Sequence, residues 1–267
     1  MFGKKKLLFL NFVTMIKQLF TIVFIFSFLN GFSQEENHTD AQGKKQGVWK
    51  KYHKNEKLRY VGQFKDDKPI GTFKYFNDAE KLQTEITHQG EFSYAKFYYP
   101  DGKIKATGKY ENQEKDSVWT YFDPQGNKQS TEFYLSGKKE GVWQVYYPNG
   151  KVAEEKEYTA DIEEGKWKQY FENGQLKMES TYKSGALEGK TFYYTANGKK
   201  RIEGNFYHGA RNGEWKFYNP DETVKKIEVY KNGHRIDENR DDDVINPDST
   251  QYEQKDYLEF EDLFPPR

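Results

Sequence analysis

The chain has 267 residues with 42 basic and 42 acidic side chains, so its formal net charge is zero, and it has no Cys. Without Cys there is no disulfide framework, no thiolate metal site, no cysteine nucleophile and no lipid-modified Cys. Residues 1–33 hold four Lys and no acid, which leaves 38 basic and 42 acidic residues, a net charge of −4, in the remainder. That balance argues against nucleic acid or anionic lipid as a partner.

Aromatic side chains are frequent for so polar a chain. The mean hydropathy is −1.08, yet the sequence has 21 Tyr, 21 Phe and 5 Trp. A disordered chain is poor in aromatic residues, whereas a thin β-sheet with one face toward water uses them without a deep aliphatic core. The composition therefore predicts β-structure.

Residues 1–33 have the order of a secretory signal peptide. An apolar run, 19–29, follows Lys17, and Gly31 and Ser33 stand three and one residues before a cleavage position ahead of Gln34. This run is too short for a transmembrane helix, which needs about 20 residues. The sequence therefore predicts export to the periplasm, the cell envelope or the medium.

Met15 begins a complete signal by itself, so residues 1–14 are either an upstream extension or a mis-assigned start. The alternative is one uncleaved anchor that joins 7–16 to 19–29 across Lys17. N-terminal sequencing of the exported protein distinguishes these readings, because a mature chain that keeps Met15 has not been cleaved.

A polar segment, 34–46, which we interpret as a linker, precedes a repeat over 47–236. The spacing is 24 residues, except for 22 between the second and third units, and the eight units start at Gly47, Gly71, Ser93, Ser117, Gly141, Gly165, Gly189 and Gly213. Every Trp stands two residues after a start, at Trp49, Trp119, Trp143, Trp167 and Trp215. Five residues after the start, all eight units have Tyr or Phe. Such self-similarity predicts a repeat architecture.

Each unit has the pattern strand, tight turn, strand, looser turn. Pro148, Asn149 and Gly150 are typical of the tight turn, because Pro presets a type I turn and Gly tolerates the left-handed position after it. We therefore predict a three-residue hairpin loop with a bulge at the Gly. The expected fold is all-β, an elongated antiparallel β-hairpin meander or solenoid of about eight 24-residue repeats.

The turn decides which face of the sheet is buried. A three-residue loop places Tyr146 opposite Val152, and two-residue alternation then adds Tyr158 to the same face. We expect this ladder to be buried and the Trp column to point to the other face. A two-residue Asn-Gly loop would reverse the pairing, because a one-residue slip flips a strand; the Pro-based turn favours the first version.

Residues 237–267 form an acidic tail, with eleven acidic and three basic residues. One interpretation is a disordered arm. The other is a cap, in which Leu258, Phe260, Leu263 and Phe264 cover the open edge of the last strand, because open edges and terminal repeats need protection.

A short motif recurs along the repeat. Tyr60, Gly62 and Phe64, followed by Gly71 and Phe73, fit a Tyr-x-Gly-x-aromatic pattern followed by Gly-x-aromatic. This pattern resembles MORN repeats, and more closely the MORN-variant repeats of bacterial proteins labelled antitoxin-like. The resemblance covers about 47–236 and implies a scaffolding, partner-binding or lipid-associated module. An export signal fits poorly with an antitoxin that acts in the cytoplasm.

Three features depart from the motif. Ser93 and Ser117 replace the Gly at the unit start, and the second unit is two residues shorter than the others. The register near 86–94 is therefore open.

The sequence offers no catalytic or metal-binding constellation. The five His, at 38, 53, 88, 208 and 234, share no repeat column and have no metal-ligand spacing. Phosphate-binding loops and nucleophile elbows are absent, and Asp241–Asp243 lacks the ligand alternation and the Gly of an EF-hand loop. We predict a protein that is not an enzyme and uses no cofactor and no metal.

The Trp column is the candidate partner-binding strip: Trp49, Trp119, Trp143, Trp167 and Trp215, flanked by Lys50, Lys168 and Lys216. Trp is a common interface anchor, although stacked Trp can equally serve to stabilise or shield a sheet face. We expect a non-enzymatic exported scaffold with a protein partner and no nucleic acid partner. A glycan or cell-wall binder and a membrane-lipid module are the alternatives.

Overall fold

The computed structural model describes residues 36–236. The chain divides into two compact units, Met1–Ile162 and Glu163–Arg267, and their described parts are called unit 1 (36–162) and unit 2 (163–236). All regular secondary structure in the described residues is β-strand. The all-β hairpin meander expected from the repeat is thus confirmed.

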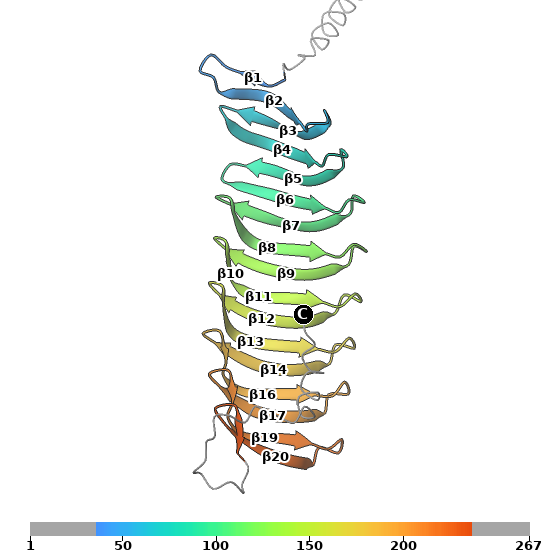
Figure 1. The fold of residues 1–267 in the computed structure, drawn as a ribbon, viewed down its shortest axis with the longest axis vertical. Helices are drawn as coiled ribbons and strands as arrows, with labels where there is room; N and C mark the ends of the chain where they lie inside the picture. The colour runs from blue at the N-terminus through green and yellow to red at the C-terminus, as the bar shows by residue number, and fades with distance from the viewer. Residues whose placement is uncertain (1–35, 237–267) are drawn as a thin grey trace, which may run out of the picture. The chain divides into compact units, whose positions relative to one another are not determined.

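Unit 1 is a meander in which each long strand pairs antiparallel with the next (Figure 1). Its strands are β1 (His38–Thr39), β2 (Lys45–Tyr52), β3 (Leu58–Lys65), β4 (Lys68–Phe76), β5 (Leu82–Gln89), β6 (Phe92–Tyr98), β7 (Ile104–Glu111), β8 (Glu114–Phe122), β9 (Lys128–Leu135), β10 (Lys138–Lys139), β11 (Gly141–Tyr146) and β12 (Val152–Thr159). The short strand β10 and the longer β11 both pair with β9.

Unit 2 repeats this arrangement, with a short strand before each of two long ones. Its strands are β13 (Ile162–Tyr170), β14 (Leu176–Lys183), β15 (Ala186–Leu187), β16 (Gly189–Tyr194), β17 (Lys200–Tyr207), β18 (Ala210–Arg211), β19 (Gly213–Tyr218), β20 (Val224–Lys231) and β21 (His234–Ile236).

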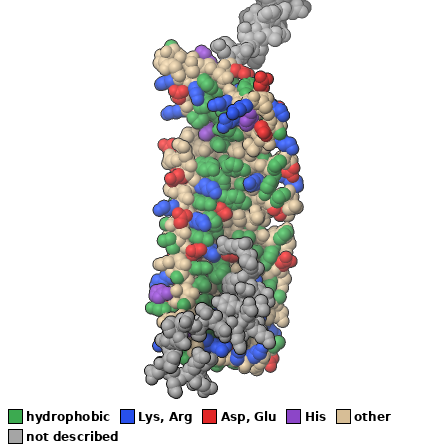
Figure 2. Space-filling view, viewed as in Figure 1, with side chains coloured by type: hydrophobic (Ala, Val, Ile, Leu, Met, Phe, Trp, Pro, Cys, Tyr) green, Lys and Arg blue, Asp and Glu red, His purple; other side chains and the backbone are tan. Residues whose placement is uncertain are grey.

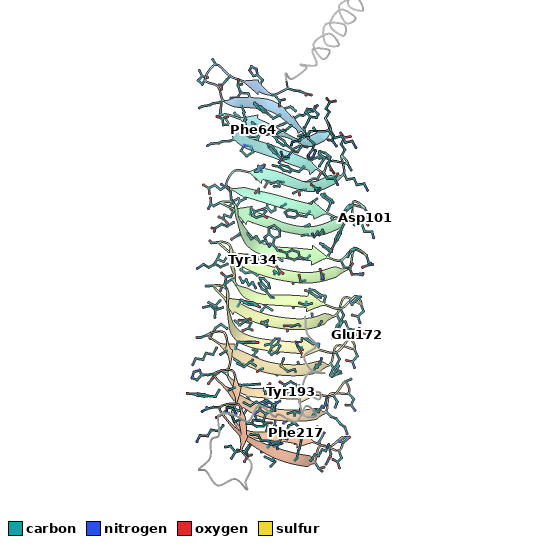
Figure 3. All side chains as sticks on the ribbon, in the orientation of Figure 1. Phe64, Asp101, Tyr134, Glu172, Tyr193 and Phe217 are labelled. Atoms are coloured by element: carbon teal, nitrogen blue, oxygen red, sulfur yellow. The ribbon has the colours of Figure 1, made fainter. Side chains whose placement is uncertain are left out.

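The tight turns have the predicted three-residue loop. Between β11 and β12, the amide of Tyr147 donates to the carbonyl of Lys151 at 2.8 Å, and the amide of Gly150 donates to the carbonyl of Tyr147 at 2.9 Å. Gly150 has a φ of +80°, the left-handed conformation that the loop requires. Asp101, labelled in Figure 3, lies in the equivalent loop between β6 and β7.

A β-bulge follows every tight turn and shifts the register by one residue. Tyr146 pairs with Val152 as predicted, but Val145 pairs with Glu154, so Ala153 is an extra residue. The same shift occurs at the other seven turns, between Lys51/Tyr52, Tyr75/Phe76, Phe97/Tyr98, Tyr121/Phe122, Gln169/Tyr170, Tyr193/Tyr194 and Phe217/Tyr218. An extra residue in one strand reverses the faces of all residues beyond it.

The predicted buried ladder is therefore wrong in two respects. Tyr158 lies on the face of Trp143, with ring centres 5.1 Å apart, rather than on the face of Tyr146 and Val152. The buried face is the Trp face, because Trp119 and Trp215 have exposed fractions of 1% and 0%. Simple two-residue alternation failed because it had no place for the bulge.

A kink marks the start of most units. The start residue has a positive φ in seven of the eight described units, at Gly47, Gly71, Ser117, Gly141, Gly165, Gly189 and Gly213. Ser93 is the exception, because the preceding turn is two residues shorter and β5 and β6 pair without interruption from Thr84↔Phe97 to Gln89↔Phe92. This settles the register near 86–94, where Ile86 pairs with Ala95.

The expected linker at 34–46 is partly structured instead. His38–Thr39 pairs with Lys45–Gln46, and the carboxylate of Asp40 accepts the amides of Gln42 and Lys44 in the connecting turn. A polar segment reads as a linker in sequence, but here its side chains stabilise a hairpin.

Two predicted segments, the signal peptide in 1–33 and the acidic tail 237–267, lie outside the described residues. Among residues 36–236, no helix has the length and apolar character needed to cross a membrane.

Candidate functional site

The five Trp of the predicted strip share one face within each unit, but they differ in accessibility. Trp119, Trp167 and Trp215 are buried, whereas Trp49 and Trp143 are half-buried. A partner cannot contact a fully buried ring without unfolding its surroundings. Trp119, Trp167 and Trp215 are thus inaccessible in this structure, and partner binding by the strip stays a prediction.

Glycine on the neighbouring strand makes this burial possible. A Cβ placed on Gly108 of β7 would lie 2.1 Å from Trp119 of β8, and one on Gly204 of β17 would lie 2.3 Å from Trp215 of β19. The rings thus lie flat on bare backbone. The Gly of the Tyr-x-Gly-x-aromatic pattern is the sequence signal for this contact, and it could have identified the buried face.

A cation covers the other side of several Trp rings. The Nζ of Lys115 lies 4.6 Å from the ring centre of Trp119, and the guanidinium carbon of Arg211 lies 4.5 Å from that of Trp215. Lys45 and Lys139 cover Trp49 and Trp143 in the same way, at 4.9 and 4.4 Å. Each cation stands four residues before its Trp, and the kink at the unit start brings it over the ring.

The Lys residues expected to flank the Trp strip lie elsewhere. Lys50, Lys168 and Lys216 each follow a Trp directly in a strand, so they point to the opposite face. The cations that do contact the rings were missed, because their contact depends on the kink rather than on sequence neighbourhood.

Lys115 sits among rings in unit 1. It contacts Trp119, Tyr121 and Tyr134 at 4.6 to 5.3 Å from the ring centres. Burial lowers the pKa of Lys115, and burial together with the hydrogen bond to Glu132 raises the pKa of Tyr134. These groups are packed against one another, so the cluster is a stabilising cation–π site rather than a place where a substrate could sit.

The opposite face of unit 1 carries charged side chains that pair with one another, beside the aromatic and aliphatic residues next to the tight turns. Lys74 and Glu85, on β4 and β5, are paired residues with a 3.5 Å ion pair, and Lys96 of β6 pairs with Glu85 from the other side. The hydroxyl of Tyr98 donates to Glu85 at 2.6 Å, and burial with this contact raises the pKa of Tyr98 to about 12.

One patch on that face is apolar and exposed. Val118 of β8 pairs directly with Phe133 of β9. Val142 of β11 lies on the same face and directly follows Gly141, where an added Cβ would lie 3.8 Å from the Phe133 ring. Their exposed fractions are 53%, 37% and 47%. Leu135, two residues after Phe133 and therefore on the same face, is also exposed. We call Val118, Phe133, Leu135 and Val142 the unit 1 apolar patch.

The equivalent pairs in the other described repeats contain at least one polar side chain. They are Val48–Gln63, Thr72–Thr87, Tyr94–Lys109, Val142–Glu157, Lys166–Thr181, Lys190–Asn205 and Glu214–Val229. The patch is thus an interruption in a polar column rather than a property of the repeat. Apart from this patch, Figure 2 shows a band of hydrophobic side chains bordered by charged ones on the face that it views.

Among residues 36–236, no three His, Asp or Glu side chains gather closely enough to hold a metal ion. A shallow cavity in unit 2 is lined by residues that include Lys199, Lys200 and Tyr218. Both Lys are already engaged, because Lys199 donates to the carbonyl of Pro220 at 2.5 Å and Lys200 pairs with Glu203 at 2.6 Å.

A family model described as MORN repeat variant matches residues 45–66, 94–112, 139–160, 163–184 and 211–232. No curated protein matches the chain.

Two solved structures show a weak likeness to the chain. A mutant of TarM from S. aureus, crystallised with fondaparinux, alpha-GlcNAc-glycerol and UDP, is 13% identical with a TM-score of 0.23, and the match covers 54% of this chain and 21% of TarM. The Tc holotoxin pore of Photorhabdus luminescens is 10% identical with a TM-score of 0.15, covering 72% of this chain and 11% of that one. The chain spans only a small part of both, and likenesses this weak carry no argument.

Proposed function

The chain belongs to the MORN repeat variant family, and from this premise we propose that it is an exported, non-enzymatic scaffold that binds a protein partner through the unit 1 apolar patch. Repeats of this family generally act as scaffold modules that bind proteins or membrane lipids. The observation that carries the choice of surface is that Val118 and Phe133 are paired, apolar and exposed, together with Val142, at a position where the pairs of the other described repeats contain at least one polar side chain.

Several physical arguments favour a protein as the partner. Exposed apolar groups that cross three adjacent strands give up water when a complementary surface covers them, and such rimmed patches mark interaction sites. Protein interfaces have this composition, an apolar centre with a polar surround. Anionic lipid is disfavoured, because the chain after residue 33 has a net charge of −4.

The scaffold role needs no catalysis. Lys115 and its neighbouring Tyr side chains lie packed between rings, and on the opposite face the carboxylate of Glu85 is held by Lys74 and Tyr98. This arrangement supports a rigid display surface, in which the rings of the Trp face hold the strands in register and the other face meets the partner.

Site-specific photo-crosslinking tests the surface. A photoreactive residue at Phe133 is compared with one at Thr181, which is the equivalent, exposed position of a unit 2 repeat. We expect one defined crosslinked protein from position 133 and none from position 181. Equal crosslinking at both positions, or none at either, contradicts the proposal.

The partner identified in this way is then bound to purified variants. Phe133→Ser is expected to weaken binding at least about tenfold, the effect of losing one anchor residue at the centre of an interface. Thr181→Ser serves as the matched control and should leave binding unchanged. Retention on isolated wall polymer or on liposomes, unaffected by Phe133→Ser, would favour a glycan or lipid ligand instead.

Export is tested separately. We expect the mature protein to begin at Gln34 after removal of the signal in 1–33. Fractionation of cells that express the full chain, followed by N-terminal sequencing, checks this. A cytoplasmic protein, or a mature chain that retains Met15, contradicts the proposed export by a cleaved signal.

A further inference from the structure

The last long strand of unit 2 has an edge that is only partly covered. β19 pairs with β20 along its length, from Gly213↔Tyr230 to Tyr218↔Val224. On the other side of β20, the short strand β21 pairs only with Val229–Lys231. The stretch 224–228 therefore has no strand on that side among the described residues, and Val224 and Ile227 are exposed there.

The backbone of Ile227 faces this open edge. The turn is closed by a hydrogen bond from the amide of Asn219 to the carbonyl of Thr223. Hydrogen-bonded and non-hydrogen-bonded pairs alternate along two antiparallel strands. Counted from the turn, and with the bulge between Phe217 and Tyr218 taken into account, Lys216↔Ile227 is a non-hydrogen-bonded pair. The N–H and C=O of Ile227 therefore point away from β19. The N–H and C=O of Ile227 are thus available to an additional strand, and such groups are rarely left unprotected.

Unit 1 protects its corresponding edge with its own chain. The amide of Asn37 donates to the carbonyl of Val48 at 2.9 Å, and the Asn37 side chain accepts the amide of Lys50 at 2.8 Å. Glu36 also pairs with the Lys50 side chain at 2.5 Å. A segment adjacent to the repeats therefore covers the outer edge of β2.

The repeat pattern itself does not continue past β21. The 24-residue period from Gly213 places the next unit start at residue 237, which is Asp instead of Gly, and the Trp position is occupied by Asn239. A ninth unit of the same kind is not encoded, so a different segment must cover the edge if it is covered from within the chain.

Residues 257–262, Tyr-Leu-Glu-Phe-Glu-Asp, have the features that the edge requires. Apolar and acidic residues alternate from Leu258 to Glu261, which is the period of a strand. The tail 237–267 has eleven acidic and three basic residues, whereas 224–236 has Lys225, Lys226, Lys231 and Arg235 against a single acid, Glu228. The twenty residues of 237–256 can extend to about 65 Å, far more than the return to β20 needs.

We propose that residues 257–262 add as a strand to the open edge of β20 at 224–228. Leu258 and Phe260 then lie on the face of Val224 and Ile227, and Glu259 lies on the face of Lys226. The tail is thus an intramolecular cap for unit 2, equivalent in role to the segment that covers β2.

Amide hydrogen exchange of the full chain tests the proposal. We expect the amide of Ile227 to exchange at least about tenfold more slowly in the full chain than in the variant Leu258→Ser/Phe260→Ser. The matched variant Leu263→Ser/Phe264→Ser changes two apolar tail residues outside the segment and should keep the protection. Rapid exchange at Ile227 in the full chain, or equal protection in all three proteins, overturns the proposal.

Dilution separates the chain's own tail from the tail of a second copy. Protection that is constant over a wide protein concentration range supports the intramolecular strand, and protection that disappears on dilution overturns it. Because the chain has no Cys, the pair Ile227→Cys and Phe260→Cys gives an independent measurement. A monomeric disulfide should form with this pair and should not form with Tyr52→Cys and Phe260→Cys.

Discussion

The regions around Trp119 in unit 1 and Trp215 in unit 2 have the same design with one difference. Each ring lies on a glycine, beneath a cation and beside a tyrosine. The indole N–H of Trp119 donates to the carbonyl of Lys109 at 3.0 Å, whereas that of Trp215 is buried without an acceptor among the described residues. Contact with the glycine backbone is thus the constant feature, and the indole hydrogen bond is dispensable.

Removing the rings should have the largest effect. Trp119→Ala and Trp215→Ala are each expected to lower the free energy of unfolding by about 3–5 kcal/mol, because both leave a large cavity. Urea unfolding followed by circular dichroism measures this without relying on Trp fluorescence. Trp143→Ala, at a half-buried ring, should cost clearly less; an equal cost would show that burial does not determine the contribution.

Filling the space under the rings should have the next largest effect. Gly108→Ala and Gly204→Ala are expected to destabilise by about 1–3 kcal/mol, because the added methyl overlaps the ring. Neither glycine has a positive φ, so backbone strain does not contribute.

A double-mutant cycle separates ring contact from other effects of these glycine changes. In the background of Trp119→Ala, the change Gly108→Ala should cost almost nothing, since the methyl then enters the vacated space. If Gly108→Ala lowers the free energy of unfolding by the same amount without the Trp119 ring, its effect does not come from contact with that ring.

Trp→Phe substitutions sharpen the one difference between the two regions. Both variants lose ring volume, but only Trp119→Phe loses a hydrogen bond, and Trp215→Phe removes a buried donor that has no acceptor. Trp119→Phe should therefore be the more destabilising by about 1 kcal/mol. The same cost at both positions would mean that Trp215 finds an acceptor in solution.

The smallest expected effect concerns pH. Burial raises the pKa of Glu228, but hydrogen bonds from Lys226 and Tyr230 outweigh it and hold the pKa below the usual value of 4.5. The folded state therefore gains stability from the ionised carboxylate above about pH 4.5, and it loses this gain as the pH falls through the lowered pKa.

Glu228→Gln should flatten the dependence of stability on pH between about 5 and 3, by less than about 1 kcal/mol. Urea midpoints at several pH values measure the slope. Tyr230→Phe removes one of the two hydrogen bonds to Glu228 and should retain part of the dependence of stability on pH. An unchanged slope in both variants would show that Glu228 does not cause this dependence.

The periodic part of the fold could be predicted from the sequence, because each repeat carries its own turn chemistry. Pro148 and Gly150 specify the three-residue loop, and the ring columns specify the strands. The buried face could not be obtained by counting, since the bulge at Ala153 adds a residue that two-residue alternation does not recognise.

The candidate site was harder to predict than the fold. Five aligned Trp suggested a binding strip, but Trp119 and Trp215 fit onto Gly108 and Gly204 and are buried, and these glycines were a visible signal of this. The unit 1 apolar patch was missed because Phe133 stands at a different repeat position from Val118 and Val142. They meet only when the strands are paired.

The contact between a glycine of one hairpin and a ring of the next restricts how the array can be rearranged. Gly62 receives Phe73 and Gly108 receives Trp119, whereas Ile86 faces the small Ala95. A duplication that placed the Ala95 hairpin after Gly62 or Gly108 would leave a hole where the ring now lies. At these junctions the hairpins are therefore not interchangeable modules, and gain or loss of a repeat there must keep the ring and its glycine together.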